Sequence, residues 1–130
     1  MLVLDASVAF AACVAAGGFE EFGAEPLVAP PLMWSEARSA IHELAWRGQI
    51  AREDAEATRR RLERCPVKPR APRRLGEEAW RVAEEFGWAK TYHAEYVALA
   101  RVLRCRLVTL DARLRRGTER LGFVVSPTEL

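Results

Sequence analysis

Two apolar stretches that each end at an aspartate, Leu2-Val3-Leu4-Asp5 and Leu107-Val108-Thr109-Leu110-Asp111, decide the fold expected for this chain. Continuous aliphatic residues are typical of strands in a parallel sheet that helices cover on both faces. In open α/β sheets the functional crevice lies beyond the carboxyl ends of the strands. The sequence therefore predicts that Asp5 and Asp111 lie together at one edge of a parallel sheet.

Two interpretations of Asp5 and Asp111 are open from the sequence. Two carboxylates that lie together repel each other unless a positive charge sits between them, and a divalent cation such as Mg²⁺ or Mn²⁺ is the usual candidate. Alternatively, each aspartate only caps the helix that follows it, as aspartate often does. The sequence favours neither interpretation over the other.

Length and composition indicate one domain, residues 1–130, because half of the residues are hydrophobic and can bury a core. No basic segment precedes the apolar run 8–14, and we find no membrane span, so a cytoplasmic protein is expected. The three cysteines lack CxxC spacing, which argues against a disulfide framework and a zinc site. P-loop and GxSxG motifs are absent, so P-loop nucleotide hydrolysis and serine-type acyl transfer are not supported.

Strands and helices are expected to alternate along the chain. Further strands are predicted over 27–29 and 123–125, and helices over 6–16, 32–47, 53–64, 75–86, 92–103 and 113–121. Helix 32–47 carries Glu36 on the flank of its apolar stripe. Three prolines within 66–72 predict a stiff linker without regular structure. This alternation predicts an α/β fold, a three-layer α/β/α sandwich around a short central parallel sheet.

Basic residues are concentrated in one segment. Residues 59–74 have a net charge of +7, whereas the whole chain has only +2. Such a concentration suits a polyanionic partner, because phosphate contacts supply most of the sequence-independent affinity for nucleic acid. A solvated helix end followed by a proline-rich loop gives the same pattern. If the partner is RNA, the expected contacts are Arg60, Arg61, Arg70 and Arg74.

Four segments, in this order, resemble PIN-domain proteins. They are Asp5-Ala6-Ser7, the helix after Pro30-Pro31 with Glu36, the run Thr-Tyr-His-Ala-Glu-Tyr-Val-Ala-Leu-Ala at 91–100, and the strand ending at Asp111. The resemblance covers essentially the whole chain and is closest to the VapC-type toxins of bacterial toxin-antitoxin modules. It implies a ribonuclease that gathers acidic residues around Mg²⁺ or Mn²⁺, is often a homodimer and is silenced by a VapB-type antitoxin.

The resemblance also implies roles for individual residues. By position, Asp5, Glu36 and Asp111 match the acidic residues of the family and are the expected catalytic group. Ser7 and Thr109 match the small hydroxyl residues beside them, and we expect these two to cap or to hydrogen-bond locally rather than to take part in chemistry.

His93 departs from the family pattern, because an aspartate of the metal site normally stands at this position. Imidazole can bind Mn²⁺ but suits Mg²⁺ poorly, since Mg²⁺ prefers oxygen ligands. One expectation is that Asp5, Asp111 and His93 hold the metal ion. The other is that His93 only caps or lines the start of its helix. Glu95 is not expected to compensate, because residues two apart on a helix point about 200° apart.

Two functions are therefore expected. The first is a metal-dependent endoribonuclease of the VapC type, in which Asp5 and Asp111, with Glu36 nearby, hold one or two ions that position a phosphate and activate water. The second is a catalytically weakened PIN domain that binds RNA or an antitoxin, because His93 has replaced an acid. The four tryptophans are expected in the core or in a dimer interface rather than stacked on bases.

Overall fold

The computed structural model describes residues 1–130 and is built around a five-stranded, fully parallel sheet with the order β3-β2-β1-β4-β5. The central strand β1 pairs with β2 and β4, and Val3 lies opposite Val28 and Leu107. All three residues of β1 are buried, which explains its uninterrupted aliphatic sequence. The strands are β1 (Leu2–Leu4), β2 (Leu27–Ala29), β3 (Lys68–Pro69), β4 (Arg106–Val108) and β5 (Val124–Val125).

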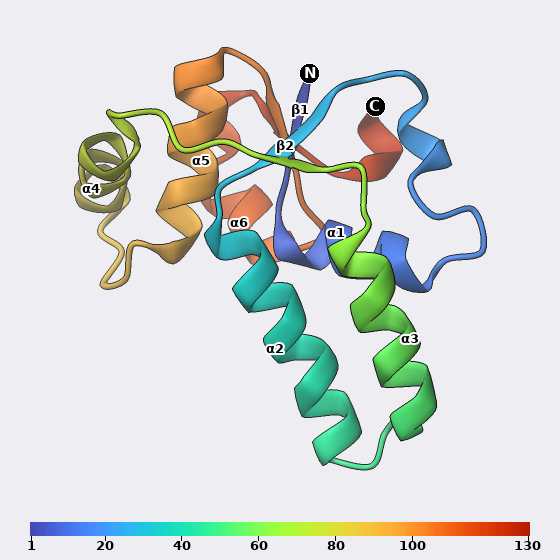
Figure 1. Cartoon of the computed structure of the whole chain (residues 1–130). Coiled ribbons are helices and arrows are strands. Elements are labelled where there is room, and N and C mark those ends of the chain that lie inside the picture. Colours follow the sequence, from blue (N-terminus) through green and yellow to red (C-terminus); the bar gives the residue numbers. More distant parts are fainter.

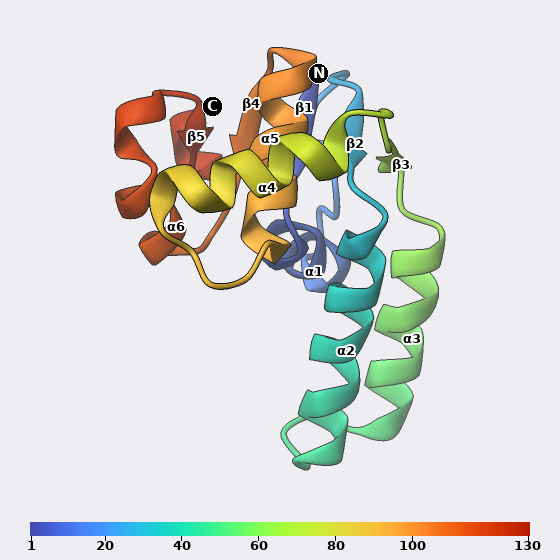
Figure 2. The same ribbon diagram turned by 90° about the vertical axis from the view of Figure 1, so that its left-hand side faces the viewer.

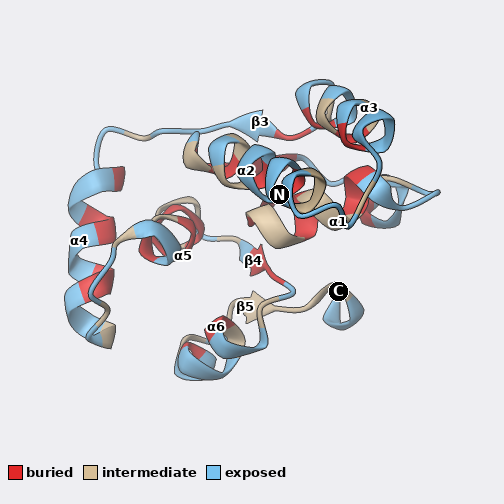
Figure 3. Ribbon diagram, turned by 90° about the horizontal axis from the view of Figure 1, so that it is seen from below, coloured by how far each residue is buried: buried red, intermediate tan, exposed pale blue.

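Helices cover both faces of the sheet (Figures 1 and 3). On one face lie α1 (Ala6–Val14), α2 (Leu32–Trp46) and α3 (Arg52–Glu63), and on the other α4 (Leu75–Phe86), α5 (Tyr92–Leu103) and α6 (Ala112–Gly117). The chain runs outward from β1 to β3 and then returns past β1 to β4 and β5. Because crossovers between parallel strands are right-handed, the helices change face where the direction reverses. The predicted three-layer sandwich is confirmed.

The core lies between the sheet and its helices, and α5 is its central helix. Residues 96–100 of α5 are all buried, as the apolar sequence on most sides of this helix predicts. This helix contacts α4, β1 and β4. Tyr92 and His93, at the start of α5, are exposed at the carboxyl edge of the sheet. The buried helix thus presents its first turn where the candidate site lies.

The helices α2 and α3 form a hairpin that extends beyond the rest of the molecule (Figure 2). Met33, Ala37 and Ile41 belong to the apolar stripe of α2 and are buried, whereas Ala40 is exposed. At the end of α2, Trp46 is 81% exposed, and Trp80 on α4 is 63% exposed. The expectation of a core position is wrong for these two tryptophans, and a role in an interface stays a prediction.

Two predicted elements differ from the structure. The proline-rich segment contains the short strand β3, because Pro69 lies on an edge strand where its missing N–H is tolerated. The amide of Arg70 then donates to the carbonyl of Ala29 over 2.9 Å. The predicted helix 113–121 is divided into α6 and a 3₁₀ turn, since the Thr118 hydroxyl donates to the Leu114 carbonyl. No helix combines the length and the apolar composition needed to cross a bilayer.

Candidate active site

Asp5 is a buried carboxylate at the junction of β1 and α1, and it is 6% exposed. Its Oδ1 accepts hydrogen bonds from the amide of Val8 at 3.1 Å and from the hydroxyl of Ser7 at 2.6 Å. Burial raises the pKa of Asp5 against the lowering effect of its hydrogen bonds, and the nearby charge of Asp111 raises it further. No cationic side chain forms an ion pair with this carboxylate, so its negative charge lacks a partner within the protein.

Two hydroxyl groups connect Asp5 to the loop between β4 and α6. Thr109, which is fully buried, donates its hydroxyl to Oδ2 of Asp5 and accepts the amide of Asp111 at 2.9 Å. The hydroxyl of Ser7 accepts the amide of Leu110 at 3.1 Å. Ser7 and Thr109 therefore fix the ends of β1 and β4 relative to each other.

Asp111 caps α6 in the same way that Asp5 caps α1. Its Oδ1 accepts the amides of Arg113 at 2.9 Å and of Leu114 at 3.2 Å. The capping interpretation is thus correct for both aspartates. It does not exclude the other one, because an ionised carboxylate offers about four lone-pair positions and these contacts leave some of them free.

Glu36 approaches the same region from α2 through Tyr96. The hydroxyl of the buried Tyr96 donates to Oε1 of Glu36. Burial and the hydrogen bond to Glu36 raise the pKa of Tyr96 far above its usual range, and the charges of Glu36 and Asp5 add to this effect. Tyr96 therefore lies within electrostatic reach of both acids, and Glu36 stands on the same side of the molecule as Asp5.

Glu95 lies within electrostatic reach of Glu36, and its expected absence from the metal site stays a prediction. Burial raises the pKa of Glu95, and so does the charge of Glu36. Glu95 directly precedes Tyr96, the residue that contacts Glu36, and neighbours on a helix differ by only about 100°. A long side chain at the side of a helix can therefore approach Glu36 as well.

His93 lies at the rim of the acidic group. Its Nε2 is 4.0 Å from Oδ2 of Asp111, and half of its side chain is exposed. Its ring meets the Trp88 ring edge-on, with 6.4 Å between the centroids. His93 and Glu36 both line one cavity of about 560 Å³, together with Gly87, Trp88, Ala89, Lys90 and Tyr92. A metal ion bound to Asp111 would thus lie within reach of His93.

The donor chemistry of this site fits a hard divalent cation. No three His, Cys, Asp or Glu side chains are close enough together to form a complete protein cage for a metal ion. Mg²⁺ does not require such a cage, because it keeps several waters and is usually bound through one or two carboxylates and substrate phosphates. Asp5 and Asp111 could supply these carboxylates, and the unpaired charge of buried Asp5 favours a cation.

Comparison with known proteins gives a family for this arrangement. Residues 2–119 match the PIN domain family. The chain belongs to the PIN-domain family. It is 36% identical over 115 residues to a VapC ribonuclease of Mycobacterium bovis and to ribonuclease VapC9 of Mycobacterium tuberculosis, covering 88% of each chain in both comparisons. The crystal structure of PAE2754 from Pyrobaculum aerophilum has a TM-score of 0.77 and 27% identity, with 98% of this chain and 92% of that chain covered. The expected resemblance to VapC-type PIN domains is confirmed.

The basic residues proposed from segment 59–74 lie in two places. Arg60, Arg61 and Arg64, near the end of α3, line a second cavity beside the C-terminal end of α1. Arg70 follows β3, and Arg74, which precedes α4, forms an ion pair with Glu78 at 3.3 Å. Asp5 lies at the opposite end of α1, and nine helical residues span about 13 Å. The arginines of α3 therefore do not surround the acidic residues.

Replacing Thr109 by valine is expected to lower the free energy of unfolding of this PIN domain by about 1–3 kcal/mol. Valine keeps the shape of threonine but leaves Oδ2 of Asp5 without a donor and the Asp111 amide without an acceptor. Urea unfolding followed by circular dichroism measures the change. The exposed Thr128, replaced in the same way, is the matched control, and equal stability of both variants would contradict the bridging role of Thr109.

Proposed function

We propose that this PIN domain is a metal-dependent endoribonuclease of the VapC type. The observation that carries the proposal is the buried carboxylate of Asp5, which has no cationic partner and lies beside Asp111 at the carboxyl edge of the sheet. The relatives from the two mycobacteria bear the name ribonuclease, and this supports a nuclease over a domain that only binds RNA or an antitoxin.

In this proposal the acidic residues have separate tasks. Asp5 and Asp111 hold Mg²⁺ or Mn²⁺ through carboxylate oxygens, and the bound cation supplies charge for the phosphate and lowers the pKa of water. Thr109 and Ser7 keep the two carboxylates in register through their hydrogen bonds. Glu36, held by Tyr96, faces the cavity and orients water on the substrate side. His93 is a further candidate ligand beside Asp111.

The partners proposed for this chain follow from its relationship to VapC proteins. They are an RNA substrate, a VapB-like antitoxin that silences the nuclease and a second copy of the chain. Trp46 and Trp80 are large exposed apolar side chains, which are enriched at protein interfaces, and they support at least one protein partner.

Cleavage of RNA in the presence of different metal ions tests the proposed function. Purified protein is incubated with structured RNA and with Mg²⁺, Mn²⁺ or a chelator. Internal cleavage is expected with at least one of the two ions and is expected to stop when the chelator is added, because the two carboxylates alone do not activate water. Cleavage that persists in chelator, or RNA binding without any cleavage, would contradict a metal-dependent nuclease.

RNA binding is proposed to use Arg60, Arg61, Arg70 and Arg74. Replacing all four by glutamine is expected to weaken binding and to reduce the slope of log affinity against log salt by up to about 3, since each single-strand phosphate contact contributes about 0.7. Fluorescence anisotropy over a range of salt concentrations measures both effects. A variant with glutamine at Arg38, Arg47, Arg52 and Arg106 removes the same charge elsewhere, and equal slopes for both variants would assign the segment to ordinary solvated surface.

A further inference from the structure

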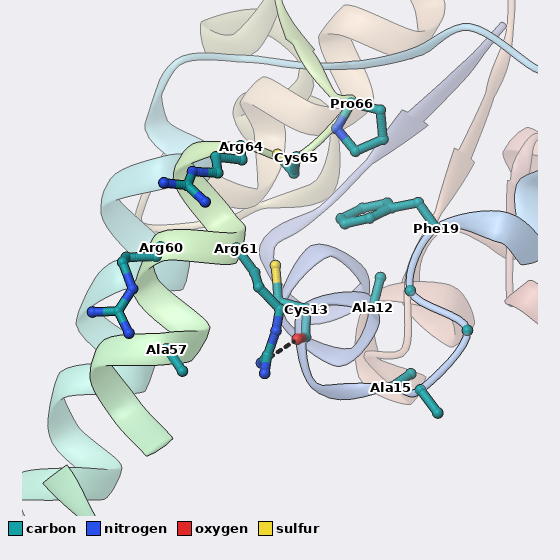
Figure 4. A pocket seen from close by; sticks show the side chains of 13 residues that line it. Ala12, Cys13, Ala15, Phe19, Ala57, Arg60, Arg61, Arg64, Cys65 and Pro66 are labelled. Atoms are coloured by element: carbon teal, nitrogen blue, oxygen red, sulfur yellow. Dashed lines mark hydrogen bonds between the residues drawn. The ribbon is translucent and has the colours of Figure 1, made fainter. Parts of the chain in front are cut away.

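The cavity beside the C-terminal end of α1 has a composition unlike that of the acidic site (Figure 4). It has a volume of about 520 Å³, and thirteen residues line it. None of these residues is an aspartate or a glutamate, whereas three are arginines at the C-terminal end of α3, Arg60, Arg61 and Arg64. A cavity of this size matches small-ligand sites, which usually measure about 300–1,000 Å³.

Most of the arginine donors in this cavity have no partner in the protein. Arg60 and Arg64 form no ion pair and no side-chain hydrogen bond, whereas the neighbouring Arg59 binds Glu56 and Glu63. Arg61 reaches between α3 and α1, where it donates to the carbonyl of Cys13 over 3.1 Å (Figure 4). That bond satisfies one of the last carbonyls of α1, and the other N–H groups of Arg61 remain available.

The opposite wall adds neutral donors and an aromatic ring. Ala16 and Gly17 line the cavity, and their amides donate to no backbone carbonyl. The ring of Phe19 faces the cavity from the side opposite α3 (Figure 4). Cys13 stays a neutral thiol, because burial raises its pKa to about 11. No group in the cavity therefore repels an anion.

We propose that this cavity is a phosphate-binding site for a ribonucleotide, separate from the acidic site at the other end of α1. Guanidinium groups match phosphate oxygens with two parallel hydrogen bonds, and an aromatic ring offers a surface for a base. An acidic peptide fits less well, because a carboxylate side chain uses neither Phe19 nor the full volume. The phosphate belongs either to an RNA strand or to a free nucleotide. The first alternative rests on the proposed nuclease function, and the second does not.

Titration of metal-free protein with AMP in the presence of a chelator tests the site without any contribution from cleavage. The amide resonances of Gly17 and Gly18 are followed by ¹⁵N NMR at constant ionic strength, with inorganic phosphate as the smallest probe. We expect these resonances to shift with AMP and to shift less with phosphate. A peptide rich in glutamate that shifts them at lower concentration than AMP would overturn the proposal.

Two variants give the sharpest comparison. The double replacement Arg60→Gln and Arg64→Gln is expected to weaken AMP binding about tenfold or more, because it removes charge-assisted hydrogen bonds to the phosphate. The matched control, Arg38→Gln with Arg52→Gln, removes the same charge from the other face of the α2–α3 hairpin. A second variant, Gly17→Glu, places a carboxylate at the cavity without a steric conflict and is expected to abolish binding. Equal AMP affinity of the wild type and both cavity variants would overturn the site.

Competition between AMP and a short single-stranded RNA identifies the source of the phosphate. Displacement of AMP by the RNA supports a strand that reaches this cavity, and binding of AMP without competition supports a free nucleotide. Metal-dependent cleavage is measured separately in the same variants. If the wild-type protein cleaves RNA but does not bind AMP, only the proposed phosphate-binding site is contradicted. If it binds AMP but does not cleave RNA, only the proposed nuclease function is contradicted.

Discussion

Replacing Asp5 by asparagine is expected to reduce metal-dependent RNA cleavage by at least about a hundredfold. Even the removal of a residue that only hydrogen-bonds to a metal ligand lowers metal affinity or activity about 10–100-fold. Asparagine keeps the size of aspartate and an oxygen that can accept from Val8 and Ser7. It removes the negative charge that favours a cation at the carboxyl edge of the sheet. The effect should therefore fall on cleavage and metal binding rather than on the fold.

The stability of the Asp5→Asn variant is expected to move in the opposite direction from its activity. Burial raises the pKa of Asp5, so at neutral pH the folded protein carries a charge that the unfolded chain carries at lower cost. Because the folded state takes up this proton at a higher pH than the unfolded state, the cost is present above the raised pKa and disappears as the pH falls through it. Without metal at pH 7, the asparagine variant should be at least as stable as the wild type.

Added metal separates the two proteins further. Mg²⁺ at a hundred times its dissociation constant stabilises a protein that binds it only in the folded state by about 2.7 kcal/mol. Urea unfolding with Mg²⁺ or chelator should show this gain for the wild type and not for Asp5→Asn. Asp54→Asn, an exposed change on α3, is the matched control. A metal-dependent gain of equal size in the Asp5→Asn variant would remove Asp5 from the metal site.

Replacing His93 by aspartate is expected to strengthen Mg²⁺ binding about tenfold or more. An opposite charge within about 4–6 Å changes a proton-binding constant by one to three powers of ten, and we expect a comparable effect on the binding of a cation. Nε2 of His93 is 4.0 Å from Asp111, so a carboxylate here would adjoin the proposed ion. The imidazole of the wild type is a softer donor, and we therefore expect the wild type to prefer Mn²⁺ over Mg²⁺ more strongly than the variant does. Cleavage supported by Mg²⁺ should rise as well.

Calorimetric titration with each ion measures this change. The other histidine of the chain, His42, is exposed on α2, and His42→Asp adds the same charge away from Asp111. The two variants should differ clearly in Mg²⁺ affinity. If His93→Asp binds Mg²⁺ no better than the wild type and His42→Asp do, His93 lies outside the metal site and only lines the start of α5.

The sequence predicted the positions of Asp5 and Asp111 better than the arrangement of the elements around them. Aliphatic runs ending at Asp5 and Asp111 indicated two parallel strands, and the shared direction of parallel strands was enough to bring both carboxylates to one edge. The sequence did not predict the electrostatic effect of Glu36 on Glu95, because this effect depends on how closely α2 lies beside α5, which periodicity within one helix does not report. The prolines predicted a linker where β3 lies, for a similar reason. An edge strand pairs on one side only, and the sequence does not show that this segment pairs with β2.

The hydroxyl link between Thr109 and Asp5 joins residues 104 positions apart in the chain. During synthesis Asp5 leaves the ribosome well before β4 and the threonine that completes its surroundings. A partly made chain therefore holds the first carboxylate without the second. The buried carboxylate of Asp5 can therefore acquire its full set of hydrogen-bond donors only after Thr109 has been synthesised.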